Sequence, residues 1–217
     1  MASHEVTGPD PGSVLRRRGI RLEWATNGWN LLEVIISIAL GIQARSLALV
    51  AFGLDSVVEV FASMIVIRNL TDQRRDPGDR RIHRALRLLA IAFWILGALL
   101  LAASLRGLVL ANRPMNSPQG IAWLALTAVV MFTLAWMKHV TGLAMGSETL
   151  IAESAMSFLD GCLSTGVLLA LILNLALGWW WTDAGAALVV AGFAFAEGVR
   201  HWRDSAPHDE DGAGPIG

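Results

Sequence analysis

The chain has 217 residues, of which 54% are hydrophobic and only 16% are charged, and its mean hydropathy is +0.53. A soluble domain of this length needs far more charge on its surface, so the composition indicates an integral membrane protein. The single cysteine, Cys162, excludes an intrachain disulfide framework and a cysteine-rich zinc module, and the net charge of −1 provides no global basic field for nucleic acid.

The two ends of the chain differ in composition from its middle. Residues 1–21 are polar, contain Gly and Pro and end in a basic cluster, without the apolar core and cleavage site of a secretory signal. We expect them to form a cytoplasmic N-terminal tail. Residues 204–217 are acidic and rich in Gly and Pro, which predicts a disordered tail and no soluble C-terminal domain. Residues 22–203 are then the transmembrane domain.

Six segments are long and apolar enough to cross a bilayer, since a spanning helix takes about 20 mostly apolar residues. The breaks between them are polar or contain Gly and Pro, and the clearest is the charge run around Pro77. We therefore predict an all-α integral membrane protein, a bundle of six transmembrane helices at residues 22–42, 46–67, 84–110, 119–140, 149–177 and 179–200.

The positions of Lys and Arg predict the orientation of this bundle, because cytoplasmic loops carry an excess of both. With the N-terminus inside, fourteen cations fall on the inner side, Lys138 and Arg200 among them, against three outside. We expect both termini in the cytoplasm and a bacterial inner (plasma) membrane as the location. Topology also explains the arginine-rich loop before residue 84, in which aspartates interleave, so we expect no nucleic-acid partner.

The second predicted span carries two acidic residues. Asp55 and Glu59 lie in "GLDSVVEVFASMIVI", one helical turn apart, and so share a face of the helix. An ionised carboxylate inside a bilayer is costly and usually serves a function. The alternative role, a hydrogen bond between helices, is common for isolated polar residues in spans.

An internal repeat relates the second span to the fifth. "SLALVAFGLDSVVE" aligns without a gap with "SETLIAESAMSFLD", 101 residues further on. The alignment places Asp55 opposite Met156 and Glu59 opposite Asp160. Both copies therefore hold a carboxylate at the same point of their span.

The fifth span presents a polar stripe of its own. Glu153, Met156, Ser157 and Asp160 follow one another at helical spacing and share one face. Two facing stripes of this kind would gather carboxylates that cannot all ionise without a compensating cation. Carboxylates occupied alternately by metal and by protons are the chemistry of a cation–proton exchanger. Glu153, near the start of this span, has contact with water as its alternative role, and Met156 has ordinary core packing. Ser157 is a candidate to support the metal site or a proton path, with a hydrogen bond between helices as the favoured alternative.

The first and last spans carry further polar residues. Asn30 and Glu33 share a face of the first span, where they are candidates to support the metal site or a proton path, or to hydrogen-bond between helices. Asp183 is expected at the start of the last helix, at the outer interface. Glu197 and His201 lie near the cytoplasmic end of that helix, where we expect them to reach water by snorkelling.

These features resemble those of the cation diffusion facilitator (CDF) family. The matching segments are "SLALVAFGLDSVVE", "LIAESAMSFLD" and "GWWWTDAGAALVV", and the likeness covers roughly residues 20–203. The resemblance implies proton-coupled efflux of a divalent cation across the lipid bilayer by a homodimer, with no enzymatic activity and no resident cofactor. It also implies a metal site made by Asp55, Glu59, Met156 and Asp160.

The sequence departs from the family pattern in its metal ligands. Glu59 stands where the family usually has Asp, and Met156 where it usually has His. Either Met156 or Glu153 is the expected fourth ligand. Zn²⁺ ranks first as the family's commonest substrate, while the carboxylates favour Fe²⁺ or Mn²⁺ as alternatives. The expected absence of the cytoplasmic C-terminal domain makes this a short form of the family.

Two other classes of function remain open. A membrane scaffold or regulatory subunit with a structural metal site would gain stability from metal without moving it. An intramembrane enzyme with paired acids would act on a lipid or organic substrate without added metal. The sequence contains no GxSxG, no Gly-rich phosphate loop and no HExxH, which disfavours the enzyme.

Overall fold

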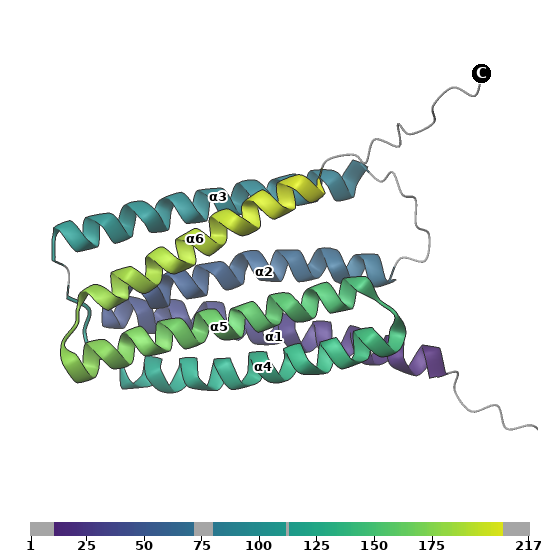
Figure 1. Ribbon diagram of the computed structural model, residues 1–217, viewed down its shortest axis with the longest axis horizontal. Helices are drawn as coiled ribbons and strands as arrows, with labels where there is room; N and C mark the ends of the chain where they lie inside the picture. Colours follow the sequence, from purple (N-terminus) through teal and green to yellow (C-terminus); the bar gives the residue numbers. More distant parts are fainter. Residues whose placement is uncertain (1–10, 72–79, 112, 206–217) are drawn as a thin grey trace, which may run out of the picture.

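The computed structural model describes residues 11–71, 80–111 and 113–205, and these ranges form six α-helices and no strand (Figure 1). The predicted all-helical fold is confirmed, while the end segments 1–10 and 206–217 lie outside the described residues. The helices are α1 (Pro11–Ala44), α2 (Leu47–Thr71), α3 (Arg80–Val109), α4 (Pro118–Met145), α5 (Glu148–Leu177) and α6 (Trp181–Asp204).

The helices follow the predicted spans closely except at the first. α1 begins at Pro11, so the arginines of the basic cluster at residues 16–21, which are expected in the N-terminal tail, belong to the same helix as the first predicted span. Five helices, all but α2, have the length and hydropathy of a membrane span over the described residues. α2 has 25 residues and runs beside the others through the same bundle (Figure 1).

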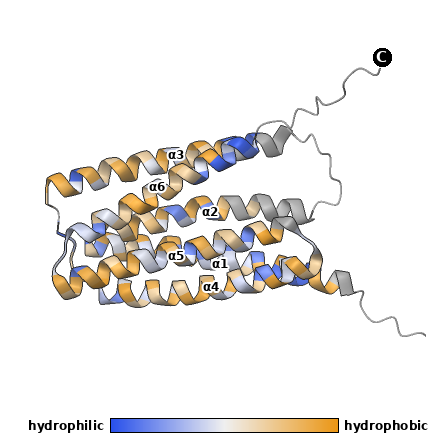
Figure 2. Cartoon of the chain, viewed as in Figure 1, coloured by the Kyte–Doolittle hydropathy of each residue, from blue (hydrophilic) through white to orange (hydrophobic). Residues whose placement is uncertain are grey.

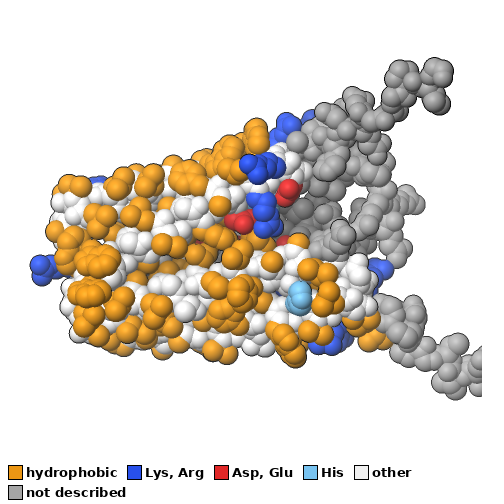
Figure 3. Space-filling model, in the orientation of Figure 1, with side chains coloured by type: hydrophobic (Ala, Val, Ile, Leu, Met, Phe, Trp, Pro, Cys, Tyr) orange, Lys and Arg blue, Asp and Glu red, His pale blue; other side chains and the backbone are white. Residues whose placement is uncertain are grey.

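The outer surface of the bundle is apolar. Large side chains such as Ile42 and Trp136 are 69% and 67% exposed, and hydrophobic side chains cover most of the face in Figure 3. Hydrophilic residues gather toward the ends of helices, most clearly where α6 ends beside α3 (Figure 2). An apolar belt with polar ends fits a helical bundle surrounded by lipid.

The helices pack as three antiparallel pairs, α1 with α2, α4 with α5, and α3 with α6. α2 also contacts α3, α5 and α6, which gives it a central place in the bundle. The main apolar core surrounds it, with Phe52 of α2 and Phe93 of α3 almost fully buried. Asp55 and Ser56 of α2, each 1% exposed, are therefore cut off from both water and lipid.

The hairpins α1–α2 and α4–α5 are built alike. The hydroxyls of Ser46 and Ser147 accept hydrogen bonds from the backbone N–H three residues on, at 3.1 and 3.3 Å. Their own N–H groups donate to the carbonyls of Gly41 and Gly142, at 2.9 and 3.0 Å, and the residue before each serine has a positive φ (52° and 61°). All these positions are related by the offset of 101 residues. The sequence repeat is thus a repeat of structure.

The two hairpins turn at opposite ends of the bundle. The Met115 N–H, which precedes α4, donates to the Ala44 carbonyl at the end of α1, so the α1–α2 turn lies where α4 begins. The α4–α5 turn lies where α4 ends (Figure 1). The repeat is therefore inverted, an arrangement found in many secondary transporters.

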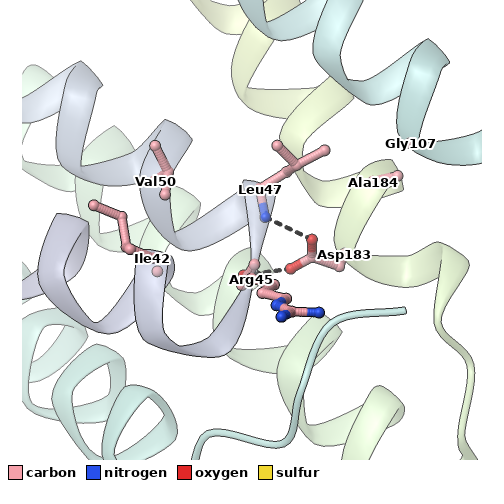
Figure 4. Close-up of a pocket in the computed structure, with 9 residues that line it drawn as sticks. Ile42, Arg45, Leu47, Val50, Gly107, Asp183 and Ala184 are labelled. Atoms are coloured by element: carbon pink, nitrogen blue, oxygen red, sulfur yellow. Dashed lines mark hydrogen bonds between the residues drawn. The ribbon is translucent and has the colours of Figure 1, made fainter. Parts of the chain in front are cut away.

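Asp183 ties the start of α6 to the start of α2. It lies in the first turn of α6, as predicted, and is 3% exposed. The Ser46 hydroxyl donates to one carboxylate oxygen, and the Leu47 N–H donates to the other at 2.8 Å (Figure 4). The carboxylate thus satisfies an N-terminal donor of α2 beside a cavity of about 270 Å³ that is lined by α1, α2, α3 and α6.

Candidate functional site

Four acidic side chains from α1, α2 and α5 interact electrostatically within the bundle, and we call Glu33, Asp55, Glu59 and Asp160 the carboxylate cluster. Glu33, Asp55 and Asp160 are at most 2% exposed, and Glu59 is partly buried. The Glu59 carboxylate interacts electrostatically with the carboxylates of both Asp55 and Asp160. Because α2 also contacts α5, the acidic residues of the two repeat copies are neighbours.

Several oxygens of the carboxylate cluster have no hydrogen-bond partner among the described residues. These are both oxygens of Asp55, both of Glu33 and one of Asp160. The Ser56 hydroxyl is near Glu33 but donates to the Phe52 carbonyl at 3.1 Å. Buried polar groups are normally paired, and a buried carboxylate without a counter-charge is especially costly. The cluster therefore has the capacity to take up a cation or protons.

α1 contributes two polar side chains to the surroundings of Glu59. The Asn30 side-chain amide donates to Glu59 Oε2 at 3.0 Å, across the interface with α2. Glu33, one turn further along, is within electrostatic reach of Glu59 and Asp55. Ser157 of α5, predicted on the polar stripe, is 4% exposed.

The two candidates for the fourth ligand each contact a basic side chain. Glu153 Oε2 lies 3.6 Å from Lys138 Nζ of α4. Met156 Sδ accepts a hydrogen bond of 3.3 Å from Arg200 Nη1 of α6. In this conformation both candidates are thus held by cations of the protein itself.

The carboxylate cluster does not form a closed coordination shell. Among the described residues, no group of three or more His, Cys, Asp or Glu side chains is arranged to hold one metal ion. The predicted ligands Asp55, Glu59 and Asp160 are neighbours, and a change of side-chain position is needed to bring them onto one ion.

Comparison with known proteins identifies the family. Residues 28–208 match the family model of the cation efflux transmembrane domain. The chain belongs to the cation efflux family. Over 200 residues it is also 19% identical to Transmembrane protein 163 of Xenopus laevis, across 92% of this chain and 71% of that protein. The family consists of cation transporters rather than enzymes, and the chain is a multi-pass integral membrane protein.

One prediction for the last helix of this cation efflux protein is wrong. Glu197 and His201 were expected to reach water, yet they are 5% and 8% exposed. Their side chains approach each other to 3.7 Å, and Glu197 is within electrostatic reach of Asp55. The cause is the rotation of α6 against α3, which stacks His201 on Phe93 with ring centroids 5.6 Å apart. The alanines at positions 184, 187, 191 and 194 follow one another at spacings of three or four residues and lead to Glu197, and they were the sequence signal for this buried face.

A buried ion pair at the other side of the cation efflux bundle was also missed. Lys138 of α4, counted from the sequence as an inner-side cation, is 0% exposed. Its ammonium lies 3.2 Å from Glu23 Oε1 of α1, another fully buried side chain. Glu23 stands seven residues before Asn30, on the same inward face of α1, so helical periodicity was the signal that could have found it.

Proposed function

We propose that this chain exports a divalent cation in exchange for protons, with Zn²⁺ as the first candidate and Fe²⁺ and Mn²⁺ as alternatives. Membership of the cation efflux family supports cation transport in general. The observation that carries the finer proposal is the carboxylate cluster, in which both oxygens of Asp55, both of Glu33 and one of Asp160 lack hydrogen-bond partners among the described residues. Negative charge that the protein leaves uncompensated is charge available to a cation or to protons.

The proposed ligands are Asp55, Glu59 and Asp160, with Met156 or Glu153 as the fourth. In the inward-facing state, deprotonated carboxylates take the cation from the cytoplasm. After the bundle rocks outward, protons displace the cation and return with the carrier. The inverted repeat supports this cycle, because such repeats give a transporter two related conformations around one midplane site.

The proposed topology places residues 22–203 in a plasma membrane with both ends in the cytoplasm. Labelling of single cysteines, in a Cys162→Ser background, with an impermeant thiol reagent tests it. Met115→Cys, before α4, should be labelled from outside in whole cells, and Asp204→Cys should not. We also propose a homodimer, which mass measurement of the detergent-solubilised protein checks.

The experiment for transport uses proteoliposomes with a metal-sensitive dye inside and a proton gradient across the membrane. Zn²⁺, Fe²⁺ and Mn²⁺ are offered separately to wild type, Asp55→Asn and Asp160→Asn. We expect one metal to enter and both variants to lose at least ten-fold in rate, since each removes a ligand charge without changing side-chain volume. Asp204→Asn, an exposed carboxylate at the end of α6, is the matched control.

Unchanged flux in Asp55→Asn or Asp160→Asn contradicts the proposed site. A wild type that gains thermal stability from metal but moves none contradicts transport and favours a scaffold with a structural metal. Flux that is independent of the proton gradient contradicts the coupling alone.

A further inference from the structure

Lys138 is a fully buried cation shared by two carboxylates from two other helices. Its Nζ lies 3.2 Å from Glu23 Oε1 and donates a hydrogen bond of 3.3 Å to Glu23 Oε2, on α1. On α5, Glu153 Oε2 is 3.6 Å away. A buried ammonium is costly unless it is paired, and here one ammonium faces two negative groups.

The two carboxylates hold Lys138 unequally. Glu23 is fully buried and approaches the ammonium through both oxygens, whereas Glu153 approaches through one, at a longer distance, and its side chain is 13% exposed. If Glu153 turns away, Lys138 keeps Glu23 as its counter-ion. Exchange of partner at Glu153 therefore avoids the large cost of stranding a buried charge.

Glu153 also belongs to the polar stripe that leads to the carboxylate cluster. It precedes Asp160 by seven residues, two helical turns on the same face of α5. The Glu59 carboxylate is within electrostatic reach of both Glu153 and Lys138. The ammonium thus lies at one end of the row of carboxylates that the proposed transport uses.

We propose that Lys138 is a tethered cation of the transport cycle, which occupies Glu153 when the site is empty and which the entering divalent cation displaces. The inference rests on the proposed function and adds a residue to it. Lys138 acts through Glu153 as a positioning residue. It holds this carboxylate away from the metal site in the empty protein and, by competing for it, weakens cation binding and favours release.

The test measures Zn²⁺ affinity by calorimetry in detergent, and flux in liposomes, for Lys138→Met, Glu153→Gln and the double variant. Lys138→Met frees Glu153, so we expect about ten-fold tighter Zn²⁺ binding together with slower maximal flux. In the Glu153→Gln background the same substitution should change affinity less than three-fold, because residues that act through one another are not additive. Arg203→Gln, an exposed cation near the end of α6, is the matched control and should behave as wild type.

Lys138→Met leaves Glu23 buried without its partner, so Lys138→Met/Glu23→Gln serves as a second variant with a neutral core. It should show the same gain in affinity. Unchanged or weaker Zn²⁺ binding in both variants, with wild-type flux intact, overturns the role of Lys138 and leaves the proposed function standing. If the wild type binds Zn²⁺ but does not move it, transport alone is overturned. The Zn²⁺ affinities of the variants then still show whether Lys138 competes with the metal for Glu153. If the wild type binds no Zn²⁺, both proposals are contradicted: that the protein carries Zn²⁺, and that Lys138 competes with Zn²⁺.

Discussion

The side-chain amide of Asn30 donates a hydrogen bond of 3.0 Å to Glu59 Oε2, and so joins α1 to α2 within the bundle. Asn30 is 1% exposed, so the donor of this bond is shielded from water, while the acceptor Glu59 is partly buried. The bond fixes one oxygen of the Glu59 carboxylate and leaves the other free to bind a cation. Groups that orient a metal ligand in this way typically contribute 10- to 100-fold to metal affinity.

Replacing Asn30 by Ala should therefore weaken metal binding by about 10- to 100-fold without unfolding the protein. The apparent KM for the transported metal, measured in proteoliposomes, reports the change. Asn27→Ala is the control, because the Asn27 amide bonds to the Glu23 carbonyl of its own helix at 3.3 Å. Equal KM values for the two variants would show that the bond to Glu59 does not orient a ligand.

The two repeat-related helix caps should differ in their contribution to stability. Ser147→Ala removes one bond to a backbone N–H and should cost about 1 kcal/mol of unfolding free energy. Ser46→Ala should cost more, because it also removes the donor to the buried Asp183 carboxylate. Thermal unfolding in detergent should give midpoints in the order wild type, Ser147→Ala, Ser46→Ala. The reverse order of the two variants would contradict a role for the Asp183 contact.

Much of the fold follows from local sequence. Hydropathy and Gly- or Pro-containing breaks are properties of neighbouring residues, so they predict the helices well, with α1 as the exception at its start. The 14-residue repeat predicted equivalent second and fifth helices. The equivalence extends upstream to Gly41 and Gly142, each of which allows the next helix to approach closely. Spacing on one helix also predicted which carboxylates share a face.

The charged contacts between helices did not follow from the sequence. Lys138 and Glu23 are 115 residues apart, and their contact depends on α4 packing against α1, which no local pattern specifies. Arg200 reaches Met156 across 44 residues for a similar reason, since α6 also packs against α5. The sequence indicated an inner-side cation at both positions, and Arg200 is indeed exposed, whereas Lys138 is fully buried. The sequence gives the charge of Lys138 but not the rotation of the helix that carries it.

Metal preference should respond to Met156. Met156→His introduces the nitrogen ligand that suits zinc and removes the sulfur that accepts the Arg200 hydrogen bond. We expect the ratio of Zn²⁺ to Mn²⁺ transport to rise by about ten-fold, equivalent to roughly 1.4 kcal/mol of binding free energy. Competition flux assays with both metals measure it. Met156→Leu, which removes the thioether without adding nitrogen, should not raise the ratio; an equal rise in both variants would assign the effect to Arg200 instead.

The pairing of α3 with α6 depends on Gly198. A Cβ at this position would lie 2.5 Å from Trp94 Nε1 and 3.1 Å from the Ala90 carbonyl oxygen. Trp94 packs against Trp202, with ring centroids 5.3 Å apart, so the indole has little room to withdraw. Overpacking of this kind typically costs about 1–3 kcal/mol, so Gly198→Ala should lower the unfolding midpoint.

Gly192 of the same helix provides the matched control for Gly198. No heavy atom lies within 4 Å of a Cβ built there, so Gly192→Ala meets no steric obstacle. Ala also favours the helix over Gly by about 1 kcal/mol, and the midpoint of this variant should be unchanged or higher. Opposite shifts for the same substitution six residues apart would locate the stabilising contact at the Trp94 face. If both variants lower the unfolding midpoint equally, the loss of stability comes from replacing glycine in this helix, and close packing of Gly198 against Trp94 does not explain it.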